Sequence, residues 1–433
     1  MTVVNKVTRH SLPGPEDISR TVLPNGIVLL VRSNQISPSV SFSGYLQAGS
    51  FYDPREKLGL STFTAAGLMR GTALRSFQQI YDDLETVGAS LGFSSSTHTV
   101  GFGGRSLAED LPMMLKLLAE CLQQPVFPPE QVEKLRTQAL TSFAIRAQDT
   151  ADMASLTFDE ILFAGHPYAL PEDGYKETVL AIQAADLPAF HQRHYGPHGM
   201  VLSIAGAVTP EEAIDQVGES LGAWTNPQQP LAPDLPPVEP LTQSVRRHIF
   251  IPGKSQIDLV LGGLGPKRKD PDFQAASIGN HILGQFGMMG RIGDIVREKS
   301  GLAYSASTSL NAWISAGSWE FSAGVSPENV GKVIDLILAE VDRFTTEPVS
   351  QEELQDTKSA YIGNLPLGLE SNAGVSRSIL NIERFQLGLD YLLNYAASIE
   401  KITAESILET AQRHLNPAIF VTITAGPQPI EVG

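Results

Sequence analysis

An internal repeat is the feature of this sequence that most constrains its fold. The longest matching segment is 192–197, which recurs 220 residues later as 412–417. Three shorter pairs recur in the same order and at nearly the same spacing: Ala119-Glu120 with Ala339-Glu340, Ala205-Gly206 with Ala425-Gly426, and Asp53-Pro54 with Asp270-Pro271. Four matches in one order indicate a duplicated unit of about 220 residues.

Each copy opens with alternating strands and continues with amphipathic helices. The alternating apolar or small positions are Val40, Phe42, Gly44 and Leu46 in the first copy, and Ile257, Leu259, Leu261 and Gly263 in the second. Such alternation favours antiparallel sheets with one face on a core. We therefore predict an α+β fold of two homologous domains, each an antiparallel sheet backed by helices. The domains span 1–225 and 241–433, and the proline-rich segment 226–240 links them.

Composition and charge exclude several classes of protein. The net charge of −16 opposes nucleic acid and anionic lipid surfaces. The single cysteine, Cys121, excludes an intrachain disulfide and a thiolate metal cluster. No apolar run is long enough to span a membrane, and the N-terminus lacks the pattern of a secretory signal, so we expect a cytoplasmic protein.

Six short segments form an ordered set along the chain. They are Leu23-Pro24-Asn25-Gly26, Gly49-Ser50, Gly71-Thr72, Gly88-Ala89-Ser90, His166-Pro167-Tyr168 and the stretch from Arg297 to Tyr304. In this order and spacing the set resembles the pitrilysin or insulinase zinc peptidases, of the two-domain type found in mitochondrial processing peptidase. The resemblance covers nearly the whole chain.

The zinc motif of that family is missing here. Active members carry His-x-x-Glu-His shortly before the Gly-Thr pair, so that two imidazoles on one helix face bind zinc and the Glu moves the proton of the water. Those positions are Thr62, Ala65 and Ala66 in this chain. The third family ligand, a Glu, would fall within 142–146, which contains no acidic residue. We therefore expect no metal and no cofactor in this chain.

The second copy retains other features of the family. Arg297 and Tyr304 match an Arg and Tyr pair that, in two-subunit members, comes from the subunit without zinc and faces the metal of the partner. The resemblance implies that this pair binds the substrate carbonyl and the developing oxyanion in trans. The resemblance also implies a role in substrate binding for Gly284, Gly287 and Gly290, although close packing of a helix on a strand explains such glycines equally well.

The leading hypothesis is a non-catalytic subunit of a heterodimeric zinc metallopeptidase, inactive alone. A homologous partner would supply the zinc, the substrate would be an unfolded peptide, and the isolated chain could form a homodimer. One alternative is a catalytically inert structural subunit of a larger complex. Another is a self-sufficient hydrolase, for which only the histidines 191, 194 and 198 offer support.

Overall fold

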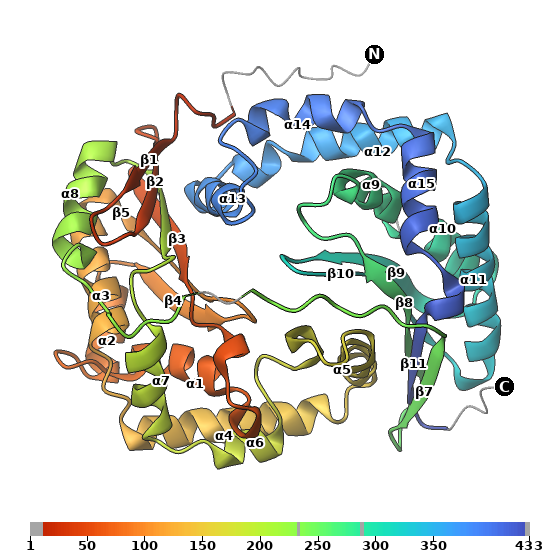
Figure 1. Ribbon diagram of the computed structural model, residues 1–433, viewed down its shortest axis with the longest axis horizontal. Coiled ribbons are helices and arrows are strands. Elements are labelled where there is room, and N and C mark those ends of the chain that lie inside the picture. The colour runs from red at the N-terminus through yellow and green to blue at the C-terminus, as the bar shows by residue number, and fades with distance from the viewer. Residues whose placement is uncertain (1–11, 232–233, 286–289, 429–433) are drawn as a thin grey trace. The chain divides into compact units, whose positions relative to one another are not determined.

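The computed structural model describes residues 12–231, 234–285 and 290–428. The chain forms two compact units, and neither is continuous in sequence. Unit 1 comprises the residues up to Ser142 together with 171–234 and 364–394. Unit 2 comprises 143–170, 235–363 and the residues from Tyr395 onward. Each unit is a sheet with helices packed on it (Figure 1).

The sheet of unit 1 has six strands in the order β1-β2-β6-β3-β5-β4. Their bounds are β1 Ser19–Val22, β2 Val28–Ser33, β3 Ser39–Leu46, β4 Ser90–Ser95, β5 Val100–Leu107 and β6 Val201–Gly206. Strands β2 and β6 are parallel, and every other neighbouring pair is antiparallel. Strand β4 forms one edge of this sheet and β1 forms the other.

The sheet of unit 2 repeats this arrangement with five strands in the order β7-β11-β8-β10-β9. Their bounds are β7 Val245–Phe250, β8 Ile257–Gly265, β9 Ala303–Ala312, β10 Gly317–Val325 and β11 Val421–Gly426. Here β7 and β11 are the parallel pair. The predicted sheets backed by helices are confirmed, but both sheets are mixed rather than wholly antiparallel, because β6 and β11 return to the sheet only after long helical segments.

Helices supply the remaining layers. In the first copy they are α1 Leu60–Gly67, α2 Phe77–Thr86, α3 Leu111–Gln123, α4 Pro129–Arg146, α5 Thr150–Leu162, α6 Lys176–Ala181, α7 Asp186–His194 and α8 Pro210–Leu221. In the second they are α9 Phe273–Gly284, α10 Gly290–Gly293, α11 Val330–Thr346, α12 Gln351–Asn364, α13 Asn372–Arg384, α14 Tyr391–Glu400 and α15 Ala404–His414. A π-helical segment, Asp294–Lys299, follows α10.

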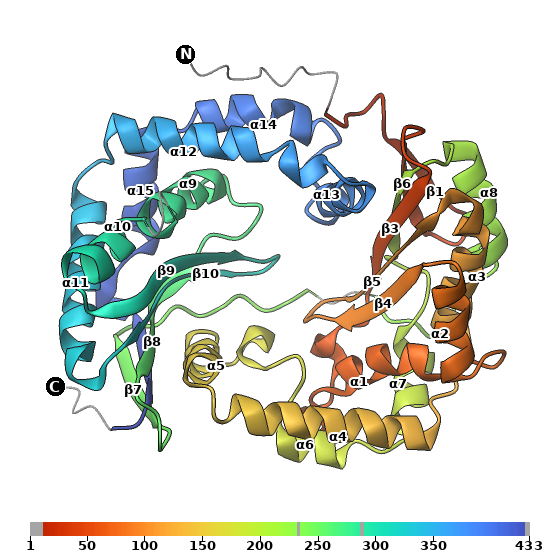
Figure 2. The same ribbon diagram turned by 180° about the vertical axis from the view of Figure 1, so that it is seen from behind.

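Two helices are exchanged between the copies. Helix α13 comes from the second copy but packs on β3 and β6 of unit 1 (Figure 2). There the Ser376 hydroxyl donates to the backbone oxygen of Ser203 at 2.9 Å, and the Asn372 amide donates to that of Ser39 at 2.9 Å. Helix α5 comes from the first copy and packs on β8 and β11 of unit 2. The compact units thus differ from the predicted continuous halves 1–225 and 241–433.

Helix α5, which packs on the sheet of unit 2, carries a half-buried acid that lies near Glu320. Burial raises the pKa of Asp159 to about 7, and the nearby Glu320 carboxylate adds to this shift. Glu320 lies on β10, where it accepts a hydrogen bond from the amide of Asn311 at 2.8 Å and another from the Ser318 hydroxyl. Burial raises the pKa of Glu320 as well. The protonated form of Asp159 is therefore favoured in the folded state.

We expect Asp159→Asn to stabilise the protein at pH 8 and to leave its stability nearly unchanged at pH 4. Because the folded-state pKa lies above the ordinary value of 3.8, the stabilisation from protonated Asp159 is complete below about pH 4 and is lost as the pH rises through about 7. The gain at pH 8 should be on the order of 2 kcal/mol. Urea denaturation at both pH values measures it. Asp152→Asn, an exposed position on the same helix, is the control, and an equal effect of both substitutions would contradict the prediction.

Among the described residues, no helix combines the length and the apolar composition needed to cross a membrane.

Candidate functional site

Helix α1 holds the three positions of the zinc motif, which in active relatives of this kind carry two zinc ligands and the general base. The helix begins after Gly59, whose φ is +97°, and the Asp53 carboxylate accepts hydrogen bonds from the backbone N–H groups of Gly59 and Ser61, each at 2.8 Å. This carboxylate therefore satisfies donors at the start of α1 that have no partner within the helix. Burial raises the pKa of Asp53 to about 7, against the opposing effect of those hydrogen bonds.

The side chains at the motif positions do not fit a zinc ion. The Thr62 hydroxyl donates to the backbone oxygen of Glu172 at 2.7 Å, and Ala65 is 1% exposed. Ala66 offers only a methyl group, which cannot ligate a metal. Within the described part of the chain, no group of three histidine, cysteine, aspartate or glutamate side chains is placed to hold a metal ion.

Glu172 is a neighbour of α1 that the sequence did not reveal. Its carboxylate accepts hydrogen bonds from the backbone N–H of Thr97 at 2.7 Å and from the hydroxyl of Thr97 at 2.9 Å. Its backbone oxygen binds Thr62, as described above. The residue thus connects the degenerate helix to the turn between β4 and β5. No sequence signal identified it, because Glu172 is distant from both partners along the chain.

Arg297 and Tyr304 flank the turn that leads into the edge strand β9. Arg297 lies in the π-helical segment, its side chain is 43% exposed, and its Nε atom is 3.9 Å from the Glu298 carboxylate. Gly301 makes the turn with a φ of +62°. Tyr304 is the second residue of β9 and is 88% exposed. The phenol is therefore a surface group on a strand whose outer edge no described strand covers.

The glycines predicted near this pair have packing reasons of their own. A Cβ atom at Gly284 would overlap the side chain and the backbone of Thr308, so α9 can approach β9 closely only with glycine there. Gly290 has a φ of +61°, and a Cβ atom there would overlap the backbone of Leu283 and Gly284. Gly287 lies outside the described residues. A role of these glycines in substrate binding stays a prediction.

The repeated Ala-Glu pair marks a buried ion cluster in each unit. Glu340 is 3% exposed and binds Arg291 at 3.2 Å and Arg343 at 2.7 Å. Arg291 also binds Glu353 at 2.6 Å, which lowers the pKa of Glu353 to about 2. Because Arg291 lies in α10, directly before the π-helical segment, this cluster ties the chain that leads to Arg297 onto α11 and α12.

In unit 1 the counterpart, Glu120, is 7% exposed. It accepts hydrogen bonds from the Thr72 hydroxyl and from Arg75, which also binds Asp83 at 2.7 Å. The Gly-Thr segment that follows the degenerate helix is thus held by a buried carboxylate in the same way. The repeated Ala-Glu pair was visible in the sequence, but the side chains that bind its two glutamates were not.

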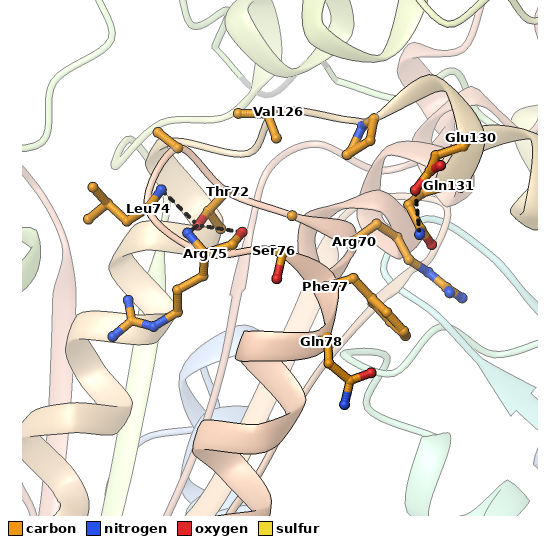
Figure 3. A pocket seen from close by; sticks show the side chains of 13 residues that line it. Arg70, Thr72, Leu74, Arg75, Ser76, Phe77, Gln78, Val126, Glu130 and Gln131 are labelled. Carbon is orange, nitrogen blue, oxygen red and sulfur yellow. Dashed lines mark hydrogen bonds between the residues drawn. The ribbon is translucent and has the colours of Figure 1, made fainter.

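The loop that follows the Gly-Thr segment borders an open pocket of about 440 Å³ (Figure 3). Its walls come from residues 70–78 and from the start of α4 with the residues that precede it. The guanidinium of Arg70 lies 5.0 Å from the centre of the Phe77 ring, and Leu74 and Val126 are exposed at the rim. The lining contains no histidine or cysteine, so it offers neither a nucleophilic thiol nor an imidazole base.

Two of the three clustered histidines, His191 and His194, belong to the packing of α7. His198 lies after the helix, and its backbone N–H donates to the Gln229 side chain at 3.0 Å. His191 Nε2 lies 2.8 Å from the backbone oxygen of Leu122, and burial lowers the pKa of this imidazole. His194 is 7% exposed and stacks between Tyr52 and Phe190, with ring centres at 4.6 and 4.5 Å. Burial lowers the pKa of His194 to about 4. These contacts are those of structural histidines and give no support to a hydrolase site.

Comparisons with known proteins agree with this arrangement. Residues 28–168 match the family description "Insulinase (Peptidase family M16)", and residues 181–361 match "Peptidase M16 inactive domain". An uncharacterized zinc protease of Mycobacterium leprae is 26% identical over 404 residues, which cover 92% of this chain and 89% of the relative. Cytochrome b-c1 complex subunit 1 of Mus musculus is 26% identical over 271 residues, which cover 61% of this chain and 55% of that protein.

A solved structure extends the likeness to three dimensions. The crystal structure of a peptidase M16 inactive domain from Pseudomonas fluorescens is 26% identical, covers 96% of this chain and 99% of that one, and superposes with a TM-score of 0.88. The two family descriptions together account for most of the chain. The chain therefore belongs to the insulinase, or M16, family of peptidases, and Thr62, Ala65 and Ala66 stand at the positions of the zinc motif.

Proposed function

We propose that this chain is the non-catalytic subunit of a heterodimeric zinc peptidase and contributes Arg297 and Tyr304 to the site of a zinc-bearing homologue. The observation that carries the proposal is a contrast between the two copies. In the first, the positions of the two zinc ligands and of the general base hold a hydroxyl and two methyl groups. In the second, the Arg and Tyr pair is retained on exposed or half-exposed side chains beside an edge strand.

In this proposal the chain binds and orients an extended peptide. Strand β9 presents an uncovered edge within the described residues, and a peptide can add to such an edge through its backbone. The guanidinium of Arg297 would donate to the carbonyl oxygen of the scissile peptide, and the phenol of Tyr304 would donate to the oxyanion that develops there. Zinc, bound in the partner, would supply the activated water.

A second candidate is a purely structural subunit. The similarity to cytochrome b-c1 complex subunit 1 of Mus musculus favours it, because that relative is named as a subunit of a complex rather than as a peptidase. The two candidates differ in what Arg297 and Tyr304 do. A structural subunit has no need of a guanidinium and a phenol that reach a substrate.

The test is peptide cleavage by the complex of this chain with a zinc-motif homologue from the same genome. We expect Arg297→Ala to reduce kcat by about 10²-fold and to leave the zinc content unchanged, because the lost donor contacts substrate rather than metal. Tyr304→Phe should reduce kcat without weakening assembly. Stoichiometric zinc and the rate of cleavage of a quenched peptide are measured on the same preparation.

Lys299→Ala is the matched control, since Lys299 lies two residues from Arg297 and its side chain is 70% exposed. It should leave kcat unchanged. An active complex that is indifferent to both Arg297→Ala and Tyr304→Phe would favour the structural candidate. Zinc and cleavage in the isolated chain would refute the proposal outright. Sedimentation of the isolated chain decides whether it is a monomer or a homodimer.

A further inference from the structure

The two sheets differ at one edge. Strand β2 of unit 1 corresponds to β7 of unit 2, because Val28 pairs with Val201 in the same way that Val245 pairs with Val421, 220 residues later than Val201. In unit 1, β1 covers the outer edge of β2 as an antiparallel neighbour. In unit 2, no described strand covers the outer edge of β7. Among the described residues, the repeat thus has a strand position that is filled in one copy and open in the other.

The backbone of β7 is arranged to accept a strand at this position. The N–H of Val245 donates to Phe420 at 2.9 Å, and that of Ile251 donates to Gly426 at 2.7 Å, so the odd-numbered residues direct their backbone groups toward β11. Because successive residues of a strand alternate, Arg246, His248 and Phe250 direct theirs outward. Unpaired donors and acceptors of this kind are a template for another chain.

The side chains on β7 indicate the chemistry of the segment that would fit. Leu29 and Leu30 of β2 are fully buried, and their counterparts on β7 are the exposed Arg246 and Arg247. Neither arginine forms an ion pair with any residue that the structure describes. They form one of the few basic clusters in a chain of net charge −16. Phe250, at the end of the strand, is 57% exposed.

We propose that the outer edge of β7 is a docking site for an acidic, extended segment of another protein. The segment would add antiparallel to β7 in the register that β1 adopts on β2, where Thr21 and Arg20 lie opposite Leu29 and Leu30. Two consecutive carboxylates would then lie opposite Arg246 and Arg247. Opposite charges across a strand pair stabilise it, and the guanidinium fork suits a carboxylate.

The charge of this edge has a simpler explanation, which the experiment must exclude. Exposed edge strands often carry charged side chains that prevent aggregation. Such protection predicts no preference for a particular ligand. A docking site predicts a preference for carboxylates and a need for backbone pairing. The proposal depends on neither Arg297 nor a zinc-bearing partner, so it can fail or succeed separately from the proposed function.

The probe is the peptide fluorescein-Thr-Val-Glu-Glu-Val-Thr-amide, labelled at its N-terminus, and its binding to the full chain is followed by fluorescence anisotropy. We expect the peptide to bind at least tenfold more tightly than the same sequence with Gln in place of Glu. Arg246→Ser with Arg247→Ser should abolish this preference. Methylation of those alternate backbone nitrogens of the peptide that would face β7 should abolish binding, because it removes the donors that pair with the strand. This comparison needs no change to the protein.

Arg55→Ser with Lys116→Ser removes two exposed cations from unit 1 and should leave binding unchanged. Equal binding of the Glu and Gln peptides, or binding that survives backbone methylation, would overturn the proposal in favour of edge protection. A self-association that Arg246→Ser with Arg247→Ser dissolves, without peptide binding, would assign the edge to a second copy and overturn it. If the peptide binds only after residues 429–433 are deleted, those residues are the occupant of the edge, and the proposal is overturned.

Discussion

Replacing Arg75 by Met should lower the free energy of unfolding of unit 1 by about 3 kcal/mol. Arg75 is the cation that binds Glu120, and Glu120 is 7% exposed. A buried carboxylate without its cation keeps the full cost of desolvation, which is why breaking such a pair from one side is expensive. The Thr72 hydroxyl remains as a partner but carries no charge. Urea denaturation, with hydrogen exchange of residues 70–131 to localise the effect, measures the loss.

A second substitution separates charge from packing. Arg75→Met with Glu120→Gln removes both charges and keeps an oxygen for Thr72, so the double variant should be more stable than the single one. Equal stability of the two variants would show that the loss comes from the arginine stem and would contradict the prediction. Arg291→Met in unit 2 offers a natural comparison. Arg291→Met should lower the free energy of unfolding by less than Arg75→Met does, because Glu340 keeps Arg343 as a partner.

The sequence predicted those parts of the architecture that depend on residues close together along the chain. The alternation in 40–46 and 257–263 predicted β3 and β8, and the repeat predicted two similar domains, each with a sheet backed by helices. The parallel pairs were missed because alternation reports which face is buried and says nothing about the direction of the neighbouring strand. The exchange of α5 and α13 was missed for a related reason. An amphipathic stripe reports that a helix has a buried face but does not identify the sheet that it meets.

The candidate site shows the same division. The absence of a zinc motif could be read from three residues, because ligand chemistry depends on residue type. The contacts that the motif positions make instead could not be read from the sequence, because Thr62 binds Glu172, which is 110 residues away along the chain. The repeated Ala-Glu pair was recognised only as a mark of duplication. The structure adds its physical reason, which is that both glutamates are buried and paired with arginine.

Trp319→Ala should lower the free energy of unfolding of unit 2 by about 3–5 kcal/mol, because a large cavity would open between its sheet and its helices. Trp319 lies on β10, is fully buried, and packs where Gly279 of α9 lets the indole approach. Trp313 is the control: it is 36% exposed, and its ring lies 5.7 Å from that of Phe163 and 5.1 Å from that of Tyr168. Its truncation should lower the free energy of unfolding by less than half as much. Circular dichroism in urea compares the two. Because Trp319 pairs with Leu310 of β9, hydrogen exchange in this strand, which carries Tyr304, should rise in Trp319→Ala alone. Equal losses of the free energy of unfolding for both tryptophans would refute this account of the core.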